Sequence, residues 1–343
     1  MLRYWVETLG CPKNAVDSDK LVGTLRADGY EAATRPDDAD LVVVNTCAFI
    51  EAARQESIDT VLALADRRRD GARLVVTGCM AERYGDELAE ALPEVDRVAG
   101  FGVPVTLGPK PAGPATAGMP AASSLERFDL LELPRPAATT PWAYVKVAEG
   151  CDRRCGFCAI PSFRGPQRSR SIDAVVAEVE ALGVAEVVLV AQDLASYGRD
   201  LTAPGGPGAK RLAALVEAVA ARTDRVRLLY LYPSELSDGL IDVIGATGCA
   251  YYDLSLQHVA RPLLRRMRRW GGGDVFLRRI EAIRRRWPDA ALRSSFIVGY
   301  PGETEDDHDA LLAFLGEAQL DWAGFFAYSA EDGTYAAGLD SAV

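Results

Sequence analysis

Short apolar runs alternate with amphipathic stretches along most of the chain. Within the first hundred residues, strands are predicted at "RYWVETL", "DLVVVNT" and "ARLVVTG". Helical periodicity follows each of them, in "DSDKLVGTLRADGY" with an end near Gly29, from about Ile50 to Arg67, and from Met80 onward. This order of elements predicts a parallel sheet with covering helices.

The same alternation resumes after Trp142. Strands are predicted at "WAYVKVAEG", "EVVLVAQD", "RVRLLYLYP", "YYDLSLQH", "LRSSFIVGY" and "AGFFAYS". Helical runs lie between them near residues 173–183, 209–222, 235–245, 273–287 and 304–318. Six β/α units in one domain predict a barrel or partial barrel, with its functional groups at the carboxyl ends of the strands.

Proline, glycine and alanine dominate the stretch between these two regions, and no apolar period persists there. We therefore expect three parts. Residues 1–108 form a three-layer α/β domain with a parallel sheet, residues 109–140 form a linker, and residues 141–343 form a second domain with a partial (βα)6 barrel.

The charge balance limits the classes of partner. The chain of 343 residues has a net charge of −11 and a pI of about 4.9. This argues against stable nucleic-acid binding through a large basic surface, and it is compatible with a basic protein partner or with solubility alone. No signal-peptide pattern and no long apolar stretch is present, so we expect a cytoplasmic protein without a membrane segment.

Three of the seven cysteines follow predicted strands of the first domain. Cys11, Cys47 and Cys79 each come just after a strand, and the carboxyl ends of parallel strands meet at one edge of a sheet. Three thiols at that edge could bind three corners of a metal cluster. The alternative is three unrelated core cysteines.

A second cysteine triplet follows the first strand of the second domain. "EGCDRRCGFCAIP" contains Cys151, Cys155 and Cys158 with the spacing C-x3-C-x2-C. Three thiolates can hold three irons of a 4Fe-4S cluster and leave the fourth iron open to a small chelating ligand. A structural zinc site is the alternative, but no fourth ligand lies nearby in the sequence, because the remaining candidates are His258, His308 and Cys249.

The second triplet, with Phe157 before its last cysteine, resembles the radical S-adenosylmethionine superfamily. The first triplet resembles the methylthiotransferases within it. "LGCPKNAVDSD", "NTCAFI", "TGCMAERY", "EGCDRRCGFCAIPSFRG", "AQDLASYG", "DLSLQH", "FIVGYPGET" and "YSAEDGT" carry this resemblance in order. "GCPKN" and "AQDLASYG" are similar to the branch that modifies a ribosomal protein.

Two features depart from this family pattern. Trp270 stands where the pattern leads us to expect proline, and the chain ends at Val343, where the family usually continues into a small β-barrel module, TRAM. We therefore expect a truncated chain with weakened substrate docking.

The resemblance implies two 4Fe-4S clusters and S-adenosylmethionine as cofactors. Cys151, Cys155 and Cys158 would hold the catalytic cluster, and Cys11, Cys47 and Cys79 the auxiliary one. The other candidate contacts to S-adenosylmethionine or substrate are Phe157 near the adenine, Gln192 and Asp193 near the amine and ribose, the basic residues Arg164, Arg168 and Arg170 near a carboxylate, and Gln257 and Gly299 at strand ends. Core packing for Phe157 and a solvated loop for the arginines are the alternatives.

The implied activity is methylthiolation of an aspartate in ribosomal protein S-12. A low-potential electron donor such as flavodoxin or ferredoxin would reduce the catalytic cluster, and a 5′-deoxyadenosyl radical would remove hydrogen from the β-carbon of that aspartate. The auxiliary cluster would present sulfur, and a second S-adenosylmethionine would supply the methyl group. Methylthiolation of a tRNA adenosine is the alternative within the family, and a non-catalytic iron-sulfur redox protein is the alternative outside it.

Two local features have structural interpretations. Thr304 is predicted to cap the helix that follows it. The basic run "RPLLRRMRRW" is compatible with nucleic-acid binding, but on a helix in an acidic chain it more often forms a solvated face.

Overall fold

A computed structural model describes residues 1–105, 129–201 and 208–340. The chain forms two compact units, Met1–Pro136 and Ala137–Val343. Most of the predicted linker, residues 109–128, lies outside the described residues. In the part of the chain that is described, no helix is long and apolar enough to cross a membrane.

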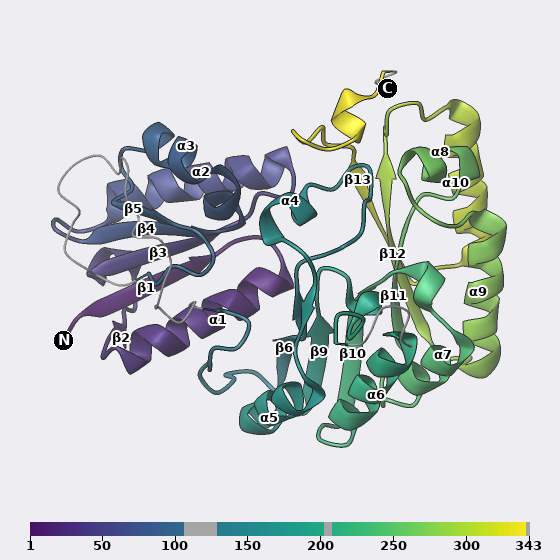
Figure 1. The fold of residues 1–343 in the computed structure, drawn as a ribbon, viewed down its shortest axis with the longest axis horizontal. Coiled ribbons are helices and arrows are strands. Elements are labelled where there is room, and N and C mark those ends of the chain that lie inside the picture. The colour runs from purple at the N-terminus through teal and green to yellow at the C-terminus, as the bar shows by residue number, and fades with distance from the viewer. Residues whose placement is uncertain (106–128, 202–207, 341–343) are drawn as a thin grey trace. The chain divides into compact units, whose positions relative to one another are not determined.

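Unit 1 contains a five-stranded sheet in the order β2-β1-β3-β4-β5, and every strand pair is parallel (Figure 1). Figure 1 shows α1 on one face of this sheet and α2 and α3 on the other. The central strand β3 is buried along its whole length, because helices cover both faces. The elements are β1 (Arg3–Thr8), α1 (Pro12–Ala27), β2 (Glu31–Ala32), β3 (Leu41–Thr46), α2 (Glu51–Arg67), β4 (Arg73–Gly78), α3 (Cys79–Ala91) and β5 (Arg97–Ala99).

The three strands and three helices predicted for this region are confirmed. The first helix begins earlier than its apolar period indicates, at Pro12, because proline is well suited to the first position of a helix. The segment around Leu131 also belongs to unit 1. The buried ammonium group of Lys20 donates a hydrogen bond of 2.6 Å to the carbonyl of Leu131.

Unit 2 contains a six-stranded parallel sheet in the order β13-β12-β11-β10-β9-β6. Strands β6 and β13 are its two edges, so the predicted partial barrel is confirmed. The strands are β6 (Trp142–Lys146), β9 (Glu186–Val190), β10 (Arg225–Leu231), β11 (Tyr251–Gln257), β12 (Ala291–Val298) and β13 (Trp322–Ala327). The predicted helices are also present, as α5 (Ile172–Leu182), α6 (Gly208–Ala220), α7 (Asp238–Gly245), α9 (Gly273–Arg286) and α10 (Glu305–Ala318).

Apolar side chains of the strands and of these helices form one core in unit 2. The hydroxyl of Thr304 accepts from the N–H of Asp307, and the carboxylate of Asp307 accepts from the N–H of Thr304, at 3.2 and 3.1 Å. This capping box confirms the predicted start of α10.

The predicted strand "WAYVKVAEG" is divided into β6 and the short strand β7 (Ala148–Glu149). Three further short elements were not predicted, because they are too short to show a period: α4 (Ile160–Arg164), β8 (Arg168–Ser169) and α8 (Arg261–Arg266). The antiparallel pair β7–β8 brackets the loop that carries the second cysteine triplet. Helix α8 ends with hydrogen bonds from the N–H groups of Arg268 and Arg269 to the carbonyls of Arg265 and Leu264.

Candidate functional site

The second cysteine triplet lies on a loop between β7 and α4 whose backbone is held at several points. The N–H of Cys151 donates to Gly165, and the N–H of Cys158 donates to Cys155, at 3.0 and 3.2 Å. Gly150 adopts φ +79°, and a Cβ there would lie 2.1 Å from the carbonyl oxygen of Pro166. The start of the loop therefore requires glycine.

The three thiols of this loop influence one another electrostatically. Burial raises the pKa of Cys151 to about 11 and that of Cys158 to about 12, and the neighbouring thiols contribute in the same direction. Thiolates are the iron ligands, so cluster loading must release protons here. Two donors point at sulfur: the backbone N–H of Arg153 lies 3.4 Å from the Sγ of Cys151, and Nη1 of Arg269 lies 3.4 Å from the Sγ of Cys155.

This donor set fits a four-iron cluster with one open iron. Among the described residues, no three His, Cys, Asp or Glu side chains come close enough to hold a single metal ion. A cluster places its three cysteine ligands on three different irons, so its sulfur atoms stand farther apart than the ligands of one ion.

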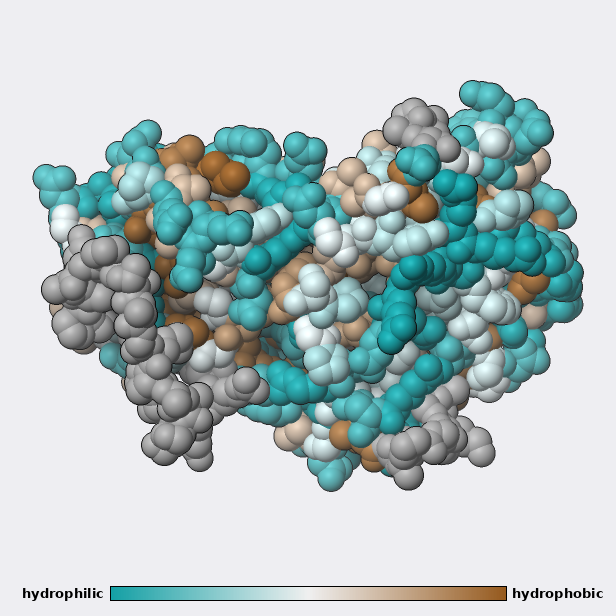
Figure 2. All heavy atoms as spheres, turned by 45° about the horizontal axis from the view of Figure 1, so that its top comes forward, coloured by the Kyte–Doolittle hydropathy of each residue, from teal (hydrophilic) through white to brown (hydrophobic). Residues whose placement is uncertain are grey.

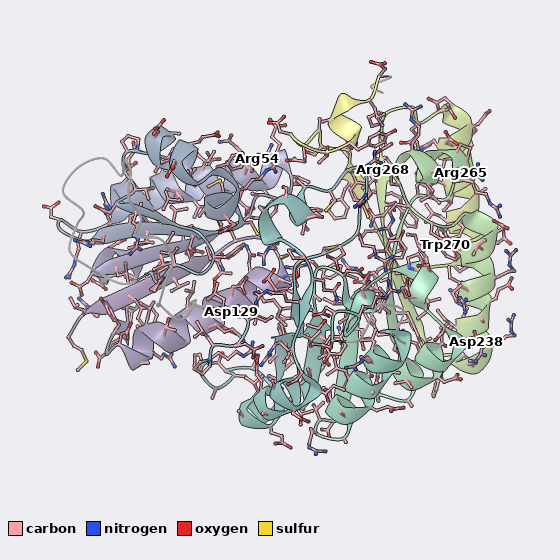
Figure 3. All side chains as sticks on the ribbon, viewed as in Figure 1. Arg54, Asp129, Asp238, Arg265, Arg268 and Trp270 are labelled. Atoms are coloured by element: carbon pink, nitrogen blue, oxygen red, sulfur yellow. The ribbon has the colours of Figure 1, made fainter. Side chains whose placement is uncertain are left out.

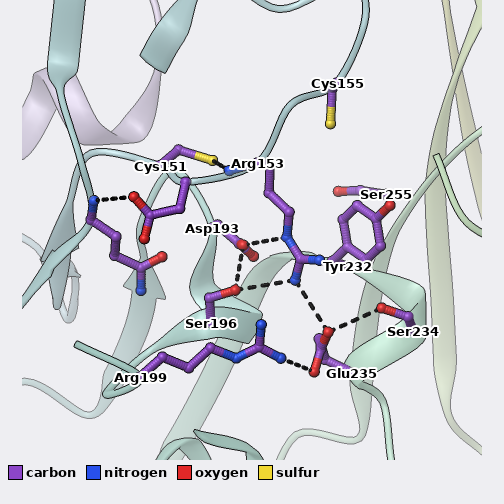
Figure 4. A network of polar contacts seen from close by, with 12 residues as sticks. Cys151, Arg153, Cys155, Asp193, Ser196, Arg199, Tyr232, Ser234, Glu235 and Ser255 are labelled. Atoms are coloured by element: carbon purple, nitrogen blue, oxygen red, sulfur yellow. Dashed lines mark hydrogen bonds and ion pairs between the residues drawn. The ribbon is translucent and has the colours of Figure 1, made fainter. Parts of the chain in front are cut away.

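Arg153, inside the cysteine loop, is the centre of a network that reaches two other segments (Figure 4). Its guanidinium group donates to Oδ2 of Asp193 at 2.6 Å, to Oγ of Ser196 at 3.1 Å and to Oε1 of Glu235 at 3.4 Å. Ser196 also donates to Asp193 at 2.5 Å. The predicted cofactor ligand Asp193 is thus ion-paired to the cysteine loop, and its contact with S-adenosylmethionine stays a prediction.

The ring of Tyr232 lies between two arginines of this site. The guanidinium carbons of Arg153 and Arg269 lie 3.9 and 4.1 Å from its centroid. Its hydroxyl accepts a hydrogen bond of 3.1 Å from the N–H of Trp270. The proline expected at position 270 would lack this N–H donor, so Trp270 allows a hydrogen bond that proline could not make.

A second network surrounds the carboxylate of Glu149, next to the loop. Lys146, Arg164 and Gln192 donate to it at 2.6, 2.9 and 2.7 Å. Burial acts to raise the pKa of Glu149, but Arg164 and Lys146 outweigh burial and hold that pKa well below its usual range. The buried Oε1 of Gln192 has no hydrogen-bond partner among the described residues, so it can accept from a ligand such as an amine.

The three predicted basic residues lie in different surroundings. Arg164 pairs with Glu149, Arg170 is buried and pairs with Glu178 at 2.6 Å, and Arg168 is exposed on β8. Of the other predicted contacts, Phe157 is half-buried against the core of unit 2, and Gln257 ends β11 with φ +71°. Their roles toward a cofactor stay predictions.

The turn at Gly299 leads to a carboxylate that the sequence reasoning missed. Oε2 of Glu303 accepts from the N–H groups of Gly299 and Tyr300, at 2.5 and 3.2 Å. Oε1 of Glu303 lies 3.4 Å from Nε2 of the buried His258 and 3.7 Å from Nδ1 of His308. Burial lowers the pKa of His258. Glu303 stands inside the quoted motif "FIVGYPGET", which is the signal that could have found it.

The first cysteine triplet lies at the carboxyl edge of the sheet in unit 1. Cys11 directly precedes α1, Cys47 follows β3, and Cys79 begins α3. Strands β1, β3 and β4 are adjacent in the sheet, which confirms that the preceding strands end at one edge. A Cβ on Gly10 would lie 2.9 Å from the Sγ of Cys47, so the loop carrying Cys11 passes close to that thiol. All seven cysteines are in the described part of the chain, and none forms a disulfide.

Asn14 ties these three loops together and was also missed as a site residue. Its Nδ2 donates to the carbonyls of Leu9 and Thr46, at 3.0 and 2.9 Å, and its Oδ1 accepts from the Sγ of Cys79 at 3.6 Å. The side chain is fully buried. Asn14, the last residue of "GCPKN", therefore holds the three cysteine loops in fixed positions relative to one another.

Comparison with known proteins covers both units. Residues 3–100 match the model of "Uncharacterized protein family UPF0004", and residues 145–315 match the radical SAM superfamily. Among solved structures, the radical S-adenosylmethionine methyltransferase TsrM from Kitasatospora setae is similar in fold, with a TM-score of 0.64 and 16% identity over 95% of this chain and 72% of TsrM.

Curated relatives are much more similar in sequence. The ribosomal protein uS12 methylthiotransferase RimO from Cutibacterium acnes is 43% identical over 98% of this chain and 78% of its own length. RimO from Geobacter sulfurreducens is 44% identical over 98% of this chain and 77% of its own length, and RimO from Moorella thermoacetica is 43% identical over 100% and 80%. The chain therefore belongs to the RimO family of radical SAM methylthiotransferases.

Proposed function

We propose that this chain attaches a methylthio group to the β-carbon of an aspartate in ribosomal protein uS12. The observation that carries the proposal is the 43% identity over 98% of the chain with a uS12 methylthiotransferase, because that span includes both cysteine triplets. Membership of the radical SAM superfamily implies S-adenosylmethionine and one 4Fe-4S cluster. The reaction would take place in the cytoplasm, where ribosomes are assembled.

Cys151, Cys155 and Cys158 would hold that cluster, which when bound supplies the electron that cleaves S-adenosylmethionine. The residues around it keep the loop rigid. Arg153 anchors the loop to Asp193, and Arg269 donates to Cys155. The unpartnered Oε1 of Gln192 is placed to accept from the amine of S-adenosylmethionine.

A second cluster would be held in unit 1 by Cys11, Cys47 and Cys79. Asn14 supports this proposal, because it fixes the cysteine loops with three hydrogen bonds inside the unit. When bound, this cluster would present the sulfur that is inserted. The residues of unit 1 would hold it and exclude water from it.

Charge favours a basic protein over tRNA as substrate. The net charge of −11 would attract a ribosomal protein at long range, whereas a tRNA would need several Lys or Arg contacts to phosphates. The proposed electron donor is a low-potential flavodoxin or ferredoxin.

Mass spectrometry tests the substrate. Anaerobically reconstituted enzyme is incubated in parallel with uS12 and with tRNA, in the presence of S-adenosylmethionine and dithionite. We expect the methylthio mass on an aspartate of uS12. Its appearance on tRNA alone would overturn the assignment, and reversible reduction without any S-adenosylmethionine cleavage would favour the redox-protein alternative.

Iron and sulfide analysis tests the two clusters. The wild type should bind about eight irons and eight sulfides, counting two four-iron clusters. The triple variants Cys11→Ser/Cys47→Ser/Cys79→Ser and Cys151→Ser/Cys155→Ser/Cys158→Ser should each bind half. Only the first should still form 5′-deoxyadenosine. Cys249→Ser is the matched control, since this cysteine belongs to neither triplet, and it should bind the wild-type amount.

A further inference from the structure

Two tyrosines, the buried Tyr300 and the exposed Tyr335, pack against the second cysteine loop at Gly156. Gly156 donates its N–H to Met267 and accepts from the N–H of Ala336, both at 2.8 Å. A Cβ on Gly156 would lie 3.1 Å from Cδ1 of Tyr335, so the tyrosine ring rests on the loop backbone. Tyr335 is 41% exposed. The loop lies close to solvent, because Asp152 and Arg154 are exposed and its three cysteines are partly exposed.

Arginines lie around Tyr335. The guanidinium carbon of Arg268 lies 3.7 Å from the centroid of the Tyr335 ring. Arg265 is exposed at the end of α8, and Arg266 packs against Gly302. Figure 3 labels Arg265 and Arg268 beside α8, and Figure 2 shows hydrophilic side chains over this side of unit 2. We call Arg265, Arg268 and Tyr335 the Arg/Tyr patch.

The backbone at Arg268 is unusual for an arginine. Its φ is +53°, the left-handed conformation that ends a helix and that favours glycine. The hydrogen bonds from Arg268 and Arg269 back to Arg265 and Leu264 are those of such a helix end. An arginine at this position is less favourable for stability than glycine, which indicates that its exposed side chain has a use.

The patch also has the opposite sign of charge from the chain as a whole. With a net charge of −11, the protein repels acidic partners at long range, so an acidic partner needs a local cationic surface to bind productively. Low-potential electron carriers of the flavodoxin type are acidic proteins, and they make small, transient contacts.

We propose that the Arg/Tyr patch is the docking surface for an acidic, low-potential electron-transfer protein that reduces the cluster held by Cys151, Cys155 and Cys158. The inference rests on the proposed function, because only a radical enzyme of this class needs such a donor. One electron would pass from the reduced flavin of the donor to the cluster, so the donor would be oxidised by one electron and the cluster reduced by one electron.

Charge reversal of the patch tests the proposal. The double variant Arg265→Glu/Arg268→Glu is compared with Arg278→Glu/Arg285→Glu, which makes the same change in charge on exposed positions of α9. Cluster reduction is followed by stopped-flow absorbance, with reduced flavodoxin or with dithionite as reductant. We expect the patch variant to be reduced by flavodoxin about tenfold more slowly at low salt, with the difference shrinking as salt is added. Its rate with dithionite should equal that of the control.

Arg268→Gly supplies a variant that folds at least as well as the wild type. Glycine suits the left-handed backbone, so the thermal midpoint should stay the same or rise. Reduction by flavodoxin should still slow several-fold, because one charge of the patch is lost.

Three results would overturn the proposal. Equal slowing of both double variants would show that net charge alone matters. Slow reduction by dithionite would show damage to the cluster loop. Normal reduction by flavodoxin together with lost uS12 modification would make the patch a substrate surface. The rate of cluster reduction is measured in the absence of S-adenosylmethionine and substrate. A failure of the docking proposal can therefore be distinguished from a failure of the proposed function.

Discussion

Arg269→Gln should make the cluster on Cys151, Cys155 and Cys158 harder to reduce. In the wild type, Nη1 of Arg269 donates to the Sγ of Cys155 at 3.4 Å, and Nη2 donates to the carbonyl of Ser255. Hydrogen bonds and positive charge at cluster sulfurs favour the more negative, reduced state. Glutamine removes the charge and keeps a shorter donor.

The expected change in midpoint potential can be worked out from the distance between Arg269 and the Sγ of Cys155. Two unit charges 3.4 Å apart interact by about 5 kcal/mol at an effective dielectric constant of 20. The added electron is spread over the whole cluster, so the share felt at one sulfur is several-fold smaller, on the order of 1.4 kcal/mol. That energy changes the ratio of reduced to oxidised cluster about tenfold, or the midpoint potential by about 59 mV for one electron.

The assay is a redox titration of the reconstituted protein, followed by the electron paramagnetic resonance signal of the reduced cluster. Arg269→Lys keeps the charge and should shift the potential less than Arg269→Gln. Arg268→Gln is the matched control, because the neighbouring arginine stacks on Tyr335. Its potential should equal that of the wild type.

An unchanged or raised potential in Arg269→Gln, with the cluster loaded at wild-type stoichiometry, would refute this reasoning. An equal shift in Arg268→Gln would also refute it, because the effect would then be due to general surface charge.

Three further predictions concern the rest of the molecule. Asn14→Leu should bind about half the iron of the wild type and keep the barrel cluster, because the buried amide holds the loops of the first triplet; iron analysis with S-adenosylmethionine cleavage checks both. Thr304→Ala should lower the free energy of unfolding by about 1 kcal/mol through loss of the cap on α10, measured by urea denaturation, with Thr34→Ala as an exposed control. Burial lowers the pKa of His258, so its contribution to stability is present above the ordinary histidine value of about 6.5 and is lost as pH falls. His258→Asn should therefore lose less stability than the wild type between about pH 7.5 and about pH 5.5; an equal loss would contradict this assignment.

The fold could be predicted because each long element has its own period or its own apolar run. Strand β3 is apolar because helices cover both of its faces, and α9 repeats its buried positions Phe276, Ile280 and Ile283 at helical spacing. Helices α4 and α8 span only five and six residues, too few to show a period. Their positions are set by packing around the cysteine loop.

Only those parts of the site that have a local sequence pattern could be predicted. The cysteines were recognisable from their intervals and from their position after strands. Arg153 and Asp193 are 40 residues apart, and Arg269 and Cys155 are 114 apart, so no local pattern indicates that they meet. Asn14 and Glu303 lay inside motifs that were quoted for resemblance, but their tasks depend on hydrogen bonds that only the folded chain reveals.

The bond between Lys20 and Leu131 sets a time during synthesis before which unit 1 cannot be finished. The two residues are 111 positions apart, and the lysine is completely buried. A ribosome adds about 5–20 residues per second, so about 6 to 22 seconds pass between them. Until Leu131 has left the ribosome, the ammonium group of Lys20 lacks this one hydrogen bond, and the segment around Leu131 cannot pack onto unit 1. Unit 1 is therefore incomplete during that interval, although Cys11, Cys47 and Cys79 have already been synthesised.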